Sequence, residues 1–505
     1  MGLGEMKNII IIGSGIGGLV AGNLLLKKGH KVTIFEAHSM PGGYTAGFYR
    51  KGCYFESGTV SLESIETVSR AMKDIGILEK IEFVNLGMRV VADNFDVTPE
   101  NYDEFKKSIC DAYPVHKEEL DKAFSDLDRI LSVLKGSSNM IMPPVMSRME
   151  MLKSLLPYIP KLPKLMKVTN EFGNVTSSEF ASRYFEKDSF PFNLFSKFSY
   201  TESSTVFLAT AFDGVFKDVW TVKGGMQSWA DTLAENFREQ GGDLKLKAHV
   251  DRIITKNRTA VGVACNEGIY EADYVISAGD YKKTFLKLLD NKSLIPEQLR
   301  NSIEKAAVSE SFFTVYLVLD IPIGDFERYM KYPHVFNLEY KPGCDIFDTE
   351  DEDYFSKTAF YLYSPSMVNP ALAPEGKSSL MILSRAPQHW MDNWGGGNRE
   401  RYRLLKEKAM HNIIDRTEAL IPGLKEHIEY KDAATPLTYE RFTQNTDGAS
   451  SAWSWNPKKE FFKNALSTNI KTPVKNLYIG SSWAVQIGGV PGAIAAAYQC
   501  VKEIK

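Results

Sequence analysis

The chain has 505 residues, 44% of them hydrophobic and 24% charged, with a formal net charge of −3 and an isoelectric point near 6.3. This length exceeds one simple domain and predicts about two to four. The slightly acidic balance gives no support for a nucleic-acid partner. The five cysteines are scattered and never form a CxxC pair, which argues against a disulfide framework or a zinc site and favours a reducing, cytoplasmic compartment.

The N-terminal segment has the pattern of a strand, a glycine-rich turn and a helix. Residues 7–12 are an apolar run typical of a strand buried on both faces of a parallel sheet. The run Gly13-Ser14-Gly15-Ile16-Gly17-Gly18 follows, and residues 19–26 continue as a helix that Gly29 ends. Residues 31–35 then predict a second strand, with Glu36 at its end.

Each part of this pattern has a physical reason if the segment binds a dinucleotide. Gly13 permits a tight turn, Gly15 allows the backbone to approach a pyrophosphate, and Gly18 allows the helix to pack closely on the sheet. The helix N-terminus favours an anion, and Glu36 is placed to bind ribose hydroxyls. The alternative is a glycine-rich turn with an incidental acid. The following Pro41-Gly42-Gly43 favours FAD as the dinucleotide.

Residues 9–26 are apolar enough to imitate a signal peptide or a membrane anchor. The glycine pattern explains them better, because the glycines serve the turn and the packing of the helix. The next most hydrophobic run, residues 312–319, has the length of a buried strand.

Two later segments extend the cofactor interpretation. The first predicts a helix at 227–240 stopped by Gly241 and Gly242, a strand at 244–250, a hairpin-like pair at 260–265 and 268–270, and a strand at 274–277. The second predicts a strand at 476–480, a loop, and a helix of small residues that begins near Val490-Pro491. Glycine and alanine there would let the backbone lie flat against a large ligand.

Three segments carry a resemblance to a known family over nearly the whole chain. They are Gly52-Cys53-Tyr54-Phe55-Glu56-Ser57-Gly58, then Ala434-Thr435-Pro436-Leu437-Thr438 with Arg441-Phe442-Thr443, and finally residues 476–493. With the N-terminal pattern, they resemble the phytoene desaturase, carotenoid isomerase and retinol saturase family of FAD oxidoreductases. This chain departs from the family at three places. Glu56 stands where the family usually has Asp, and Tyr44 stands where many relatives have Arg. Two tryptophans, Trp453 and Trp455, lie close together in the segment after Gly448. These departures bear on the substrate more than on the cofactor.

The resemblance implies an α/β fold with a discontinuous, Rossmann-like FAD-binding domain and a substrate domain with a mixed sheet and a helical cap. The FAD-binding domain would comprise residues 6–72, 217–289 and 471–505, and the substrate domain residues 73–216, which include the cap, and 290–470. Strands of the substrate sheet are expected at 312–319, 360–363 and 380–383, and a charged surface helix at 399–420.

The expected FAD-binding residues combine the glycine pattern, the end of the second strand, the double glycine and the two later segments. They are Gly13, Ser14, Gly15, Ile16, Gly17, Gly18, Glu36, Ala37, Gly42, Gly43, Tyr44, Thr45, Val250, Ser277, Ala278, Gly279, Gly480, Gly489, Val490, Pro491 and Ala493. Residues 42–45 and 488–493 should bracket the flavin ring, as the resemblance implies.

Residues 140–168 combine six methionines and five prolines with five basic residues and a single acid, Glu150. The prolines would break any long helix. Flexible apolar side chains beside cations are typical of a lipid-facing surface, so one interpretation is a peripheral membrane contact at a tunnel mouth. The other interpretation is a helical cap packed on the protein's own core.

No catalytic set can be recognised from spacing. The eight histidines form no HxH or HExxH motif, and no metal site is expected. This fits chemistry centred on a flavin, where the protein supplies orientation, electrostatics and water exclusion. The catalytic residues therefore stay unassigned.

The predicted function is an FAD-dependent oxidoreductase that acts on carbon–carbon bonds of a long isoprenoid or polyene lipid. Desaturation, saturation and isomerisation stay open, with residues 434–438 favouring the last two by resemblance. An amine oxidase is the enzymatic alternative, with Trp453 and Trp455 as its aromatic pair. A protein that escorts prenylated proteins is the non-enzymatic alternative. The substrate, the electron donor or acceptor and the oligomeric state are left open.

Overall fold

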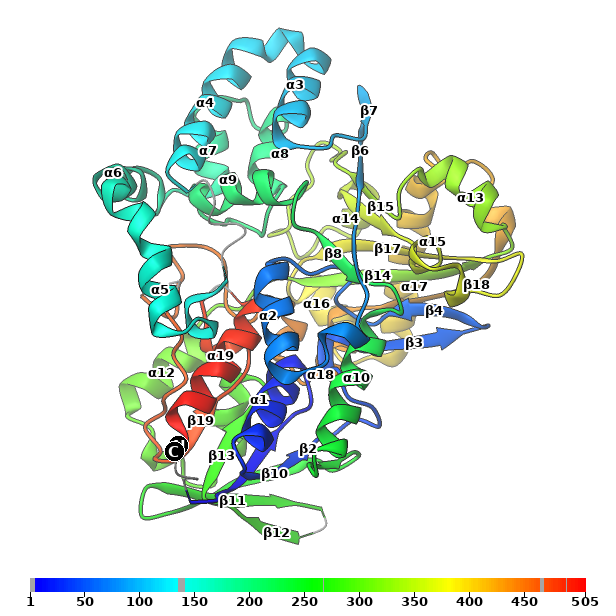
Figure 1. Cartoon of the computed structure of the whole chain (residues 1–505). Helices are drawn as coiled ribbons and strands as arrows, with labels where there is room; N and C mark the ends of the chain where they lie inside the picture. Colours follow the sequence, from blue (N-terminus) through cyan, green and yellow to red (C-terminus); the bar gives the residue numbers. More distant parts are fainter. Residues whose placement is uncertain (1–4, 135–140, 267, 464–466, 487) are drawn as a thin grey trace.

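The protein is described here by a computed structural model that covers residues 5–134, 141–266, 268–463, 467–486 and 488–505. Two residues of the predicted segments, Met140 and Ile487, lie outside these ranges. The fold is mixed α/β, as the sequence predicts. Its lower part in Figure 1 is built on a parallel sheet, and its upper part holds a mixed sheet and a group of helices.

The parallel sheet has five strands in the order β19-β13-β1-β2-β9. Its strands are β1 (Asn8–Ile12), β2 (Lys31–Phe35), β9 (Asp243–Lys245), β13 (Tyr274–Ser277) and β19 (Leu477–Ile479). The apolar runs form these strands because helices pack on one face and the antiparallel strands of residues 250–271 pack on the other, so side chains pointing either way are buried. The helices of this part are α1 (Ile16–Lys27), α2 (Ile65–Ile75), α10 (Met226–Glu239), α11 (Tyr281–Lys283), α12 (Glu297–Lys305) and α19 (Gly489–Glu503).

One predicted strand, residues 244–250, is wrong. The structure divides this stretch between β9 in the parallel sheet and β10 (Val250–Lys256) in a separate antiparallel sheet. The chain turns between them at Lys247, whose φ is +57°. β10 pairs with β11 (Thr259–Cys265), which pairs with β12 (Gly268–Glu271), so the predicted hairpin is confirmed with one additional strand.

The second large sheet has seven strands in the order β18-β14-β17-β16-β15-β6-β7. Its strands are β6 (Met88–Ala92), β7 (Phe95–Val97), β14 (Ser311–Leu319), β15 (His334–Asn337), β16 (Phe360–Tyr363), β17 (Ser378–Ala386) and β18 (Ile428–Ala434). Only the β15–β6 pair is parallel, so the sheet is mixed. Two short pairs, β3–β4 and β5–β8, lie between the two large sheets: β3 (Gly47–Arg50), β4 (Cys53–Glu56), β5 (Phe83–Asn85) and β8 (Trp220–Val222).

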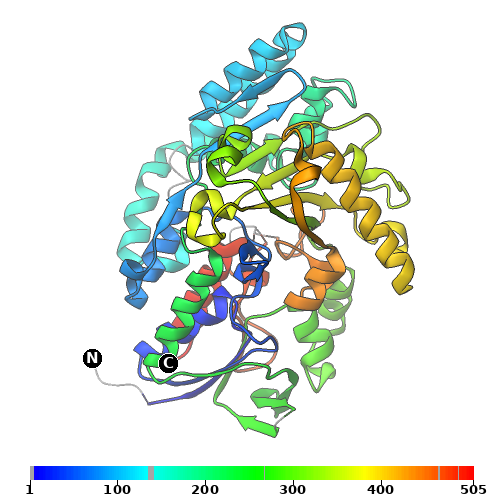
Figure 2. The ribbon, with the colours of Figure 1, turned by 90° about the vertical axis from the view of Figure 1, so that its right-hand side faces the viewer.

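Helices cover the mixed sheet in two groups, seen from two sides in Figures 1 and 2. The cap at the top of Figure 1 contains α3 (Tyr102–Ala112), α4 (Lys117–Leu134), α7 (Ser177–Ala181), α8 (Phe190–Lys197) and α9 (Thr205–Gly214), and beside it run α5 (Arg148–Leu155) and α6 (Leu162–Phe172). The second group is α13 (Ile323–Met330), α14 (Tyr354–Lys357), α15 (Pro365–Val368), α16 (Trp390–Gly395), α17 (Arg399–Thr417) and α18 (Pro436–Thr443). The predicted helix at 399–420 is thus confirmed, although Leu405, Ile413 and Ile414 are buried.

The segment labelled α16, which precedes α17, is a left-handed turn rather than an ordinary α-helix. Met391, Asp392, Asn393 and Trp394 have φ between +50° and +61°, and three glycines with positive φ follow at 395–397. A left-handed turn costs roughly 1–2 kcal/mol for each residue with a Cβ atom. Two fully or nearly fully buried tryptophans, Trp390 and Trp394, pack edge to face within this turn, at 4.7 Å between ring centroids.

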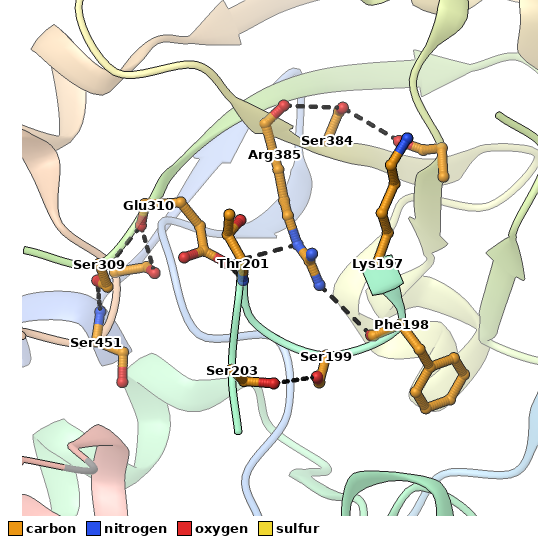
Figure 3. A network of polar contacts seen from close by, with 12 residues as sticks. Lys197, Phe198, Ser199, Thr201, Ser203, Ser309, Glu310, Ser384, Arg385 and Ser451 are labelled. Atoms are coloured by element: carbon orange, nitrogen blue, oxygen red, sulfur yellow. Dashed lines mark hydrogen bonds and ion pairs between the residues drawn. The ribbon is translucent and has the colours of Figure 1, made fainter. Parts of the chain in front are cut away.

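A buried ion pair joins the cap to the mixed sheet (Figure 3). Arg385 of β17 lies 3.6 Å from the carboxylate of Glu310, which also accepts a hydrogen bond from the backbone N–H of Thr201 at 3.0 Å. Arg385 also donates to the carbonyl of Phe198 at the end of the cap. Ser450 donates its hydroxyl to the backbone carbonyl of Glu310, so Glu310 also holds the segment that follows α18.

A buried carboxylate holds β4 against the start of α10. The carboxylate of Glu56, which is fully buried, accepts hydrogen bonds from the Tyr54 hydroxyl at 2.7 Å and from the N–H of Met226 at 3.0 Å. Burial raises the pKa of Glu56 to about 8, because desolvation outweighs these two hydrogen bonds.

This pKa makes the stability of the protein depend on pH. The folded state holds the Glu56 proton more tightly than the unfolded state, so the stabilisation is fully present below the unfolded pKa of 4.5 and is lost as pH rises through about 8. Glu56→Gln keeps a neutral side chain with an acceptor for Met226. The melting temperature of this variant, relative to the wild type, should rise by several degrees as pH increases through this window.

Differential scanning fluorimetry across this pH range measures the effect, with the exposed Glu297→Gln as the control that should follow the wild type. A melting-temperature difference between Glu56→Gln and wild type that stays constant with pH would contradict the prediction.

Candidate functional site

The carboxyl ends of the parallel strands meet at one edge of the sheet, and a cavity of about 650 Å³ lies there. β1, β2 and β13 end at Ile12, Phe35 and Ser277, and the chain immediately after each of them lines the cavity. Ligands of open α/β sheets bind in this crevice, where the strands end and the helices begin. The cavity is therefore the first candidate for a functional site.

The glycines around the cavity have two different roles. A Cβ atom at Gly15 would find no protein atom closer than 4.0 Å, and one at Gly279 would meet nothing within 4 Å. Both residues line the cavity, so packing against the protein does not require glycine there. Gly17 and Gly18 differ, since a Cβ atom would lie 2.2 Å from the Gly480 carbonyl and 2.1 Å from the Gly13 carbonyl, respectively.

Two helices present uncapped N-termini to the cavity. α1 begins after Gly15 and α19 after Gly488, and neither has a side-chain cap or an acidic residue in its first turn. The first N–H groups of a helix lack partners within the helix, and its dipole is positive at this end. Both ends are suited to bind anionic or electron-rich groups of a ligand.

Glu36 is fixed in position by its own neighbours. One oxygen of its carboxylate accepts hydrogen bonds from the N–H and the hydroxyl of Ser14, at 2.8 and 2.7 Å, and the other accepts from the N–H of His38 at 2.8 Å. Glu36 lines the cavity as well. The carboxylate is thereby oriented before any ligand arrives, with lone pairs left to accept from a hydroxyl group.

Tyr44 follows the double glycine and is tightly held. Its hydroxyl donates to the carbonyl of Gly448 at 2.8 Å, and its ring stacks on Tyr439 at 5.8 Å. Burial raises the pKa of Tyr44, so the phenol stays protonated. The neighbouring Thr45 donates its hydroxyl to the carbonyl of Gly42, which closes the turn around the cavity.

The structure brings most of the predicted site residues together in this one cavity. Those that line it are Gly13, Gly15, Ile16, Gly17, Glu36, Ala37, Gly42, Gly43, Tyr44, Thr45, Val250, Ser277, Ala278, Gly279, Gly489, Val490 and Ala493. Ser14, Gly18, Gly480 and Pro491 are not among the lining residues. Ser14 orients Glu36, while Gly18 and Gly480 lie in close backbone contacts.

Sequence reasoning missed several lining residues, and two groups of them have clear structural roles. Asp280 caps the start of α11, Lys283 ends it and Thr284 follows; the Asp280 carboxylate accepts from the N–H groups of Lys283 and Thr446. Burial raises the pKa of Asp280. The second group is the end of α18 and its following turn, residues 441–445. Only the Arg441-Phe442-Thr443 resemblance signalled this second group, because nothing in its spacing suggests a ligand.

The lining fits a dinucleotide with a flavin. Bare glycine backbone and the uncapped start of α1 suit the pyrophosphate, and the oriented Glu36 carboxylate suits a ribose. The uncapped start of α19 offers N–H groups to a second polar edge of the ligand. Each of these features lies on the same cavity.

The two tryptophans proposed as an amine-binding pair line neither the cavity at the strand ends nor the cavity that adjoins it. Trp453 is fully buried, stacks on Phe461 at 4.2 Å and donates its Nε1–H to the carbonyl of Trp483. Trp455 stacks on Tyr200 at 4.3 Å. Both have structural surroundings that explain them.

Three comparisons with known proteins agree with this geometry. Residues 16–505 match the family model of flavin-containing amine oxidoreductases. Prolycopene isomerase 2 of an Oncidium hybrid is 27% identical, covering 88% of this chain and 75% of its own length. All-trans-retinol 13,14-reductase of Danio rerio is 25% identical, and the match covers 98% of this chain and 85% of the reductase. The 4,4'-diapophytoene desaturase of a Methylomonas species is 26% identical, and the match covers 91% of this chain and 89% of the desaturase.

Solved structures show the same fold. Putrescine oxidase bound to putrescine has a TM-score of 0.64 at 16% identity, covering 99% of each chain. An oxidoreductase from Methanosarcina mazei has a TM-score of 0.60 at 16% identity, covering 98% of this chain and all of its own. With its family match over nearly the whole length, the chain belongs to the flavin-containing amine oxidoreductases and is an FAD-dependent oxidoreductase.

Proposed function

We propose that this enzyme acts on carbon–carbon double bonds of a long isoprenoid polyene lipid. One observation carries the proposal: sequence similarity to enzymes named for carotenoids and retinol covers 88–98% of the chain, including the mixed sheet and its helices. Amine oxidases match at 14–16% identity, which reflects the shared fold. Trp453 is buried, Trp455 stacks on Tyr200, and neither lines the cavity at the strand ends, so the pair does not support an amine substrate.

Residues 434–438, which favoured saturation or isomerisation by resemblance, do not decide the direction of the reaction. Thr435 and Thr438 form a capping box at the start of α18, with Pro436 in the first turn. The helix start therefore explains the Thr-Pro-Leu-Thr sequence without reference to chemistry. The proposal covers desaturation, saturation and isomerisation alike.

We also propose that FAD contacts the predicted residues that line the cavity, with the pyrophosphate over residues 13–18 and the ribose at Glu36. Bound FAD would supply the electron-transfer chemistry. The chain would hold the cofactor through the N-termini of α1 and α19 and keep Tyr44 protonated and fixed beside it. The predicted division into an FAD-binding domain and a substrate domain is supported by the five parallel strands, which come from all three of its FAD-binding segments.

An apolar substrate would have to reach the enzyme from a membrane, and one surface suits that task. Eight of the sixteen exposed large apolar side chains in the described residues lie between positions 149 and 166: Met149, Met151, Leu152, Leu155, Leu156, Ile159, Leu162 and Met166. They belong to α5, the short 3₁₀ helix Leu156–Lys161 and α6, which we call the exposed arm (Figure 1). The prolines divide it into short helices, as the sequence predicts.

The charges of the exposed arm suit an anionic lipid surface. None of its five cations, at positions 148, 153, 161, 164 and 167, has a carboxylate partner within the described residues. Its two acids pair with the body of the protein: Glu150 with Arg70 of α2 at 2.9 Å, and Glu171 with Arg129 of α4 at 2.7 Å. These ion pairs tie both ends of the arm to the rest of the chain. None of the helices in the described ranges is both long and apolar enough to cross a bilayer. We propose peripheral contact through this arm.

The cofactor contacts can be tested by two substitutions. Gly15→Val would place a branched side chain in the open cavity, so the protein should fold without binding FAD. Glu36→Gln would turn an amide N–H₂ toward Ser14 or His38 and remove a charged acceptor. FAD binding should therefore weaken by about 1.5–3 kcal/mol. Flavin absorbance after reconstitution and FAD titration measure both effects, with Gly324→Ala as a control on the surface. Full FAD binding by Gly15→Val would contradict the assignment.

The substrate class can be tested on purified, FAD-loaded protein. Lipids that co-purify should include a polyene chain, and incubation with a poly-cis carotenoid and reduced flavin should change its double-bond geometry or number. Chromatography with absorbance spectra and mass spectrometry measures the products, and Gly15→Val protein is the matched control. Turnover of amines with no change in any polyene would contradict the proposal.

The exposed arm predicts salt-sensitive binding to membranes. Apolar insertion would supply most of the affinity, and each cation near an anionic leaflet would add on the order of 1 kcal/mol. Replacing Lys153, Lys161, Lys164 and Lys167 by Glu should abolish sedimentation with phosphatidylserine-containing vesicles while FAD stays bound. A variant with the same charge change elsewhere, at Lys187, Lys292, Lys305 and Lys463, should sediment far better. Wild-type protein that stays in the supernatant at low salt would contradict this prediction.

A further inference from the structure

A second cavity of about 690 Å³ adjoins the FAD cavity. It lies between β3, the end of β18, α18 and the start of α17. The two cavities share part of their linings: Glu36, His38, Gly43, Arg441, Phe442 and Thr443. Apart from the shared residues Glu36 and Gly43, the FAD assignment does not use the second cavity, and the proposed function gives the cavity no role.

The inner wall of this cavity is apolar and aromatic. Phe48, Tyr316, Leu437 and Trp394 line it. Trp394 is only 1% exposed, and its Nε1–H has no hydrogen-bond partner anywhere in the described ranges. Because this Nε1 atom has almost no accessible surface, the wall presents apolar and aromatic carbon to the cavity rather than an open donor.

The rim of the cavity carries free positive charge. Arg50 and Arg399 are exposed, line the cavity and have no carboxylate within ion-pair distance among the residues that the structure places. Arg50 instead lies over the ring of Phe48, at 4.8 Å. The two acids of the lining are already engaged, since Asp432 pairs with Lys406 at 2.7 Å and Glu36 accepts from Ser14. The open guanidinium groups suit a carboxylate or a phosphate.

The strained turn before α17 forms part of this site. The left-handed residues 391–394 and the three glycines after them bring Trp394, Gly397 and Arg399 into one lining. Strained backbone of this kind persists where its surroundings determine it, and it clusters at ligand sites. The turn thus links the unpartnered indole of the wall to a free cation of the rim.

We propose that the second cavity binds an anionic amphiphile, with its carboxylate or phosphate at Arg50 and Arg399 and its apolar chain against Phe48, Tyr316 and Leu437. The cavity has the size of ordinary small-molecule sites, which are mostly apolar with a few placed polar groups. Because its lining overlaps that of the FAD cavity, the bound molecule would lie directly beside the cofactor site.

Isothermal titration of FAD-loaded wild-type protein tests the proposal, with four probes used below their micelle concentrations. Oleate is the carboxylate probe, geranylgeranyl diphosphate the phosphate probe, oleyl alcohol the neutral probe and NADPH the dinucleotide probe. Oleate, geranylgeranyl diphosphate or both should bind. Oleyl alcohol should bind at least roughly 10-fold more weakly, because a charge-assisted hydrogen bond is lost. The tighter of the two anionic probes identifies the head group.

Three variants locate the site. Arg50→Ala and Arg399→Ala should each lower the affinity for the anionic probe by roughly 10-fold. Leu437→Trp should block binding by filling the cavity. Arg403→Ala, an exposed arginine outside the lining, should bind as the wild type does. Flavin absorbance should be equal in all four. Failure of both anionic probes to bind wild type, equal affinity for oleyl alcohol, binding of NADPH alone, or unchanged binding by both arginine variants would overturn the proposal.

Discussion

The close contact between α1 and the loop after β19 is the constraint on which the cofactor site depends. A Cβ atom at Gly17 would lie 2.2 Å from the carbonyl oxygen of Gly480, so only glycine lets the first helix reach a segment more than 450 residues away. α1 and α19 consequently lie side by side, as Figure 1 shows in blue and red. Their uncapped N-termini open on the same cavity, which neither terminal segment could form alone.

The junction between the parallel sheet and the mixed sheet depends on two buried acidic side chains. Glu56, which its raised pKa keeps mostly protonated at neutral pH, holds β4 against α10. The Glu310–Arg385 ion pair holds the cap, β17 and the segment after α18 to one another. A buried ion pair contributes little net stability, because desolvation offsets its attraction. Both acids require well-defined hydrogen-bond geometry, so they fix how the mixed sheet and its cap sit beside the cavity at the strand ends.

Two surfaces of the molecule have the character that the proposals above require. The exposed arm carries half of the exposed large apolar side chains among the described residues, while the second cavity offers an apolar wall under a cationic rim. The arm is held at its base by the Arg70–Glu150 pair and presents its methionines and leucines outward. The proposed membrane contact of the arm fits an apolar substrate, whereas the second cavity would hold a different, anionic molecule.

The sequence alone determined the cofactor, the strand–turn–helix start and most of the cavity lining, because these depend on local patterns: glycines at fixed spacing, apolar strands and helix starts. Only the tertiary structure decided which glycines line the open cavity and which pack against the protein, since Gly15 and Gly18 differ in what surrounds them rather than in residue type. It also showed that residues 244–250 divide between two sheets, because a turn at Lys247 interrupts an apolar pattern that looks continuous. The second cavity was invisible in the sequence, because β3, β14, the left-handed turn, α17 and α18 come together there from distant parts of the chain.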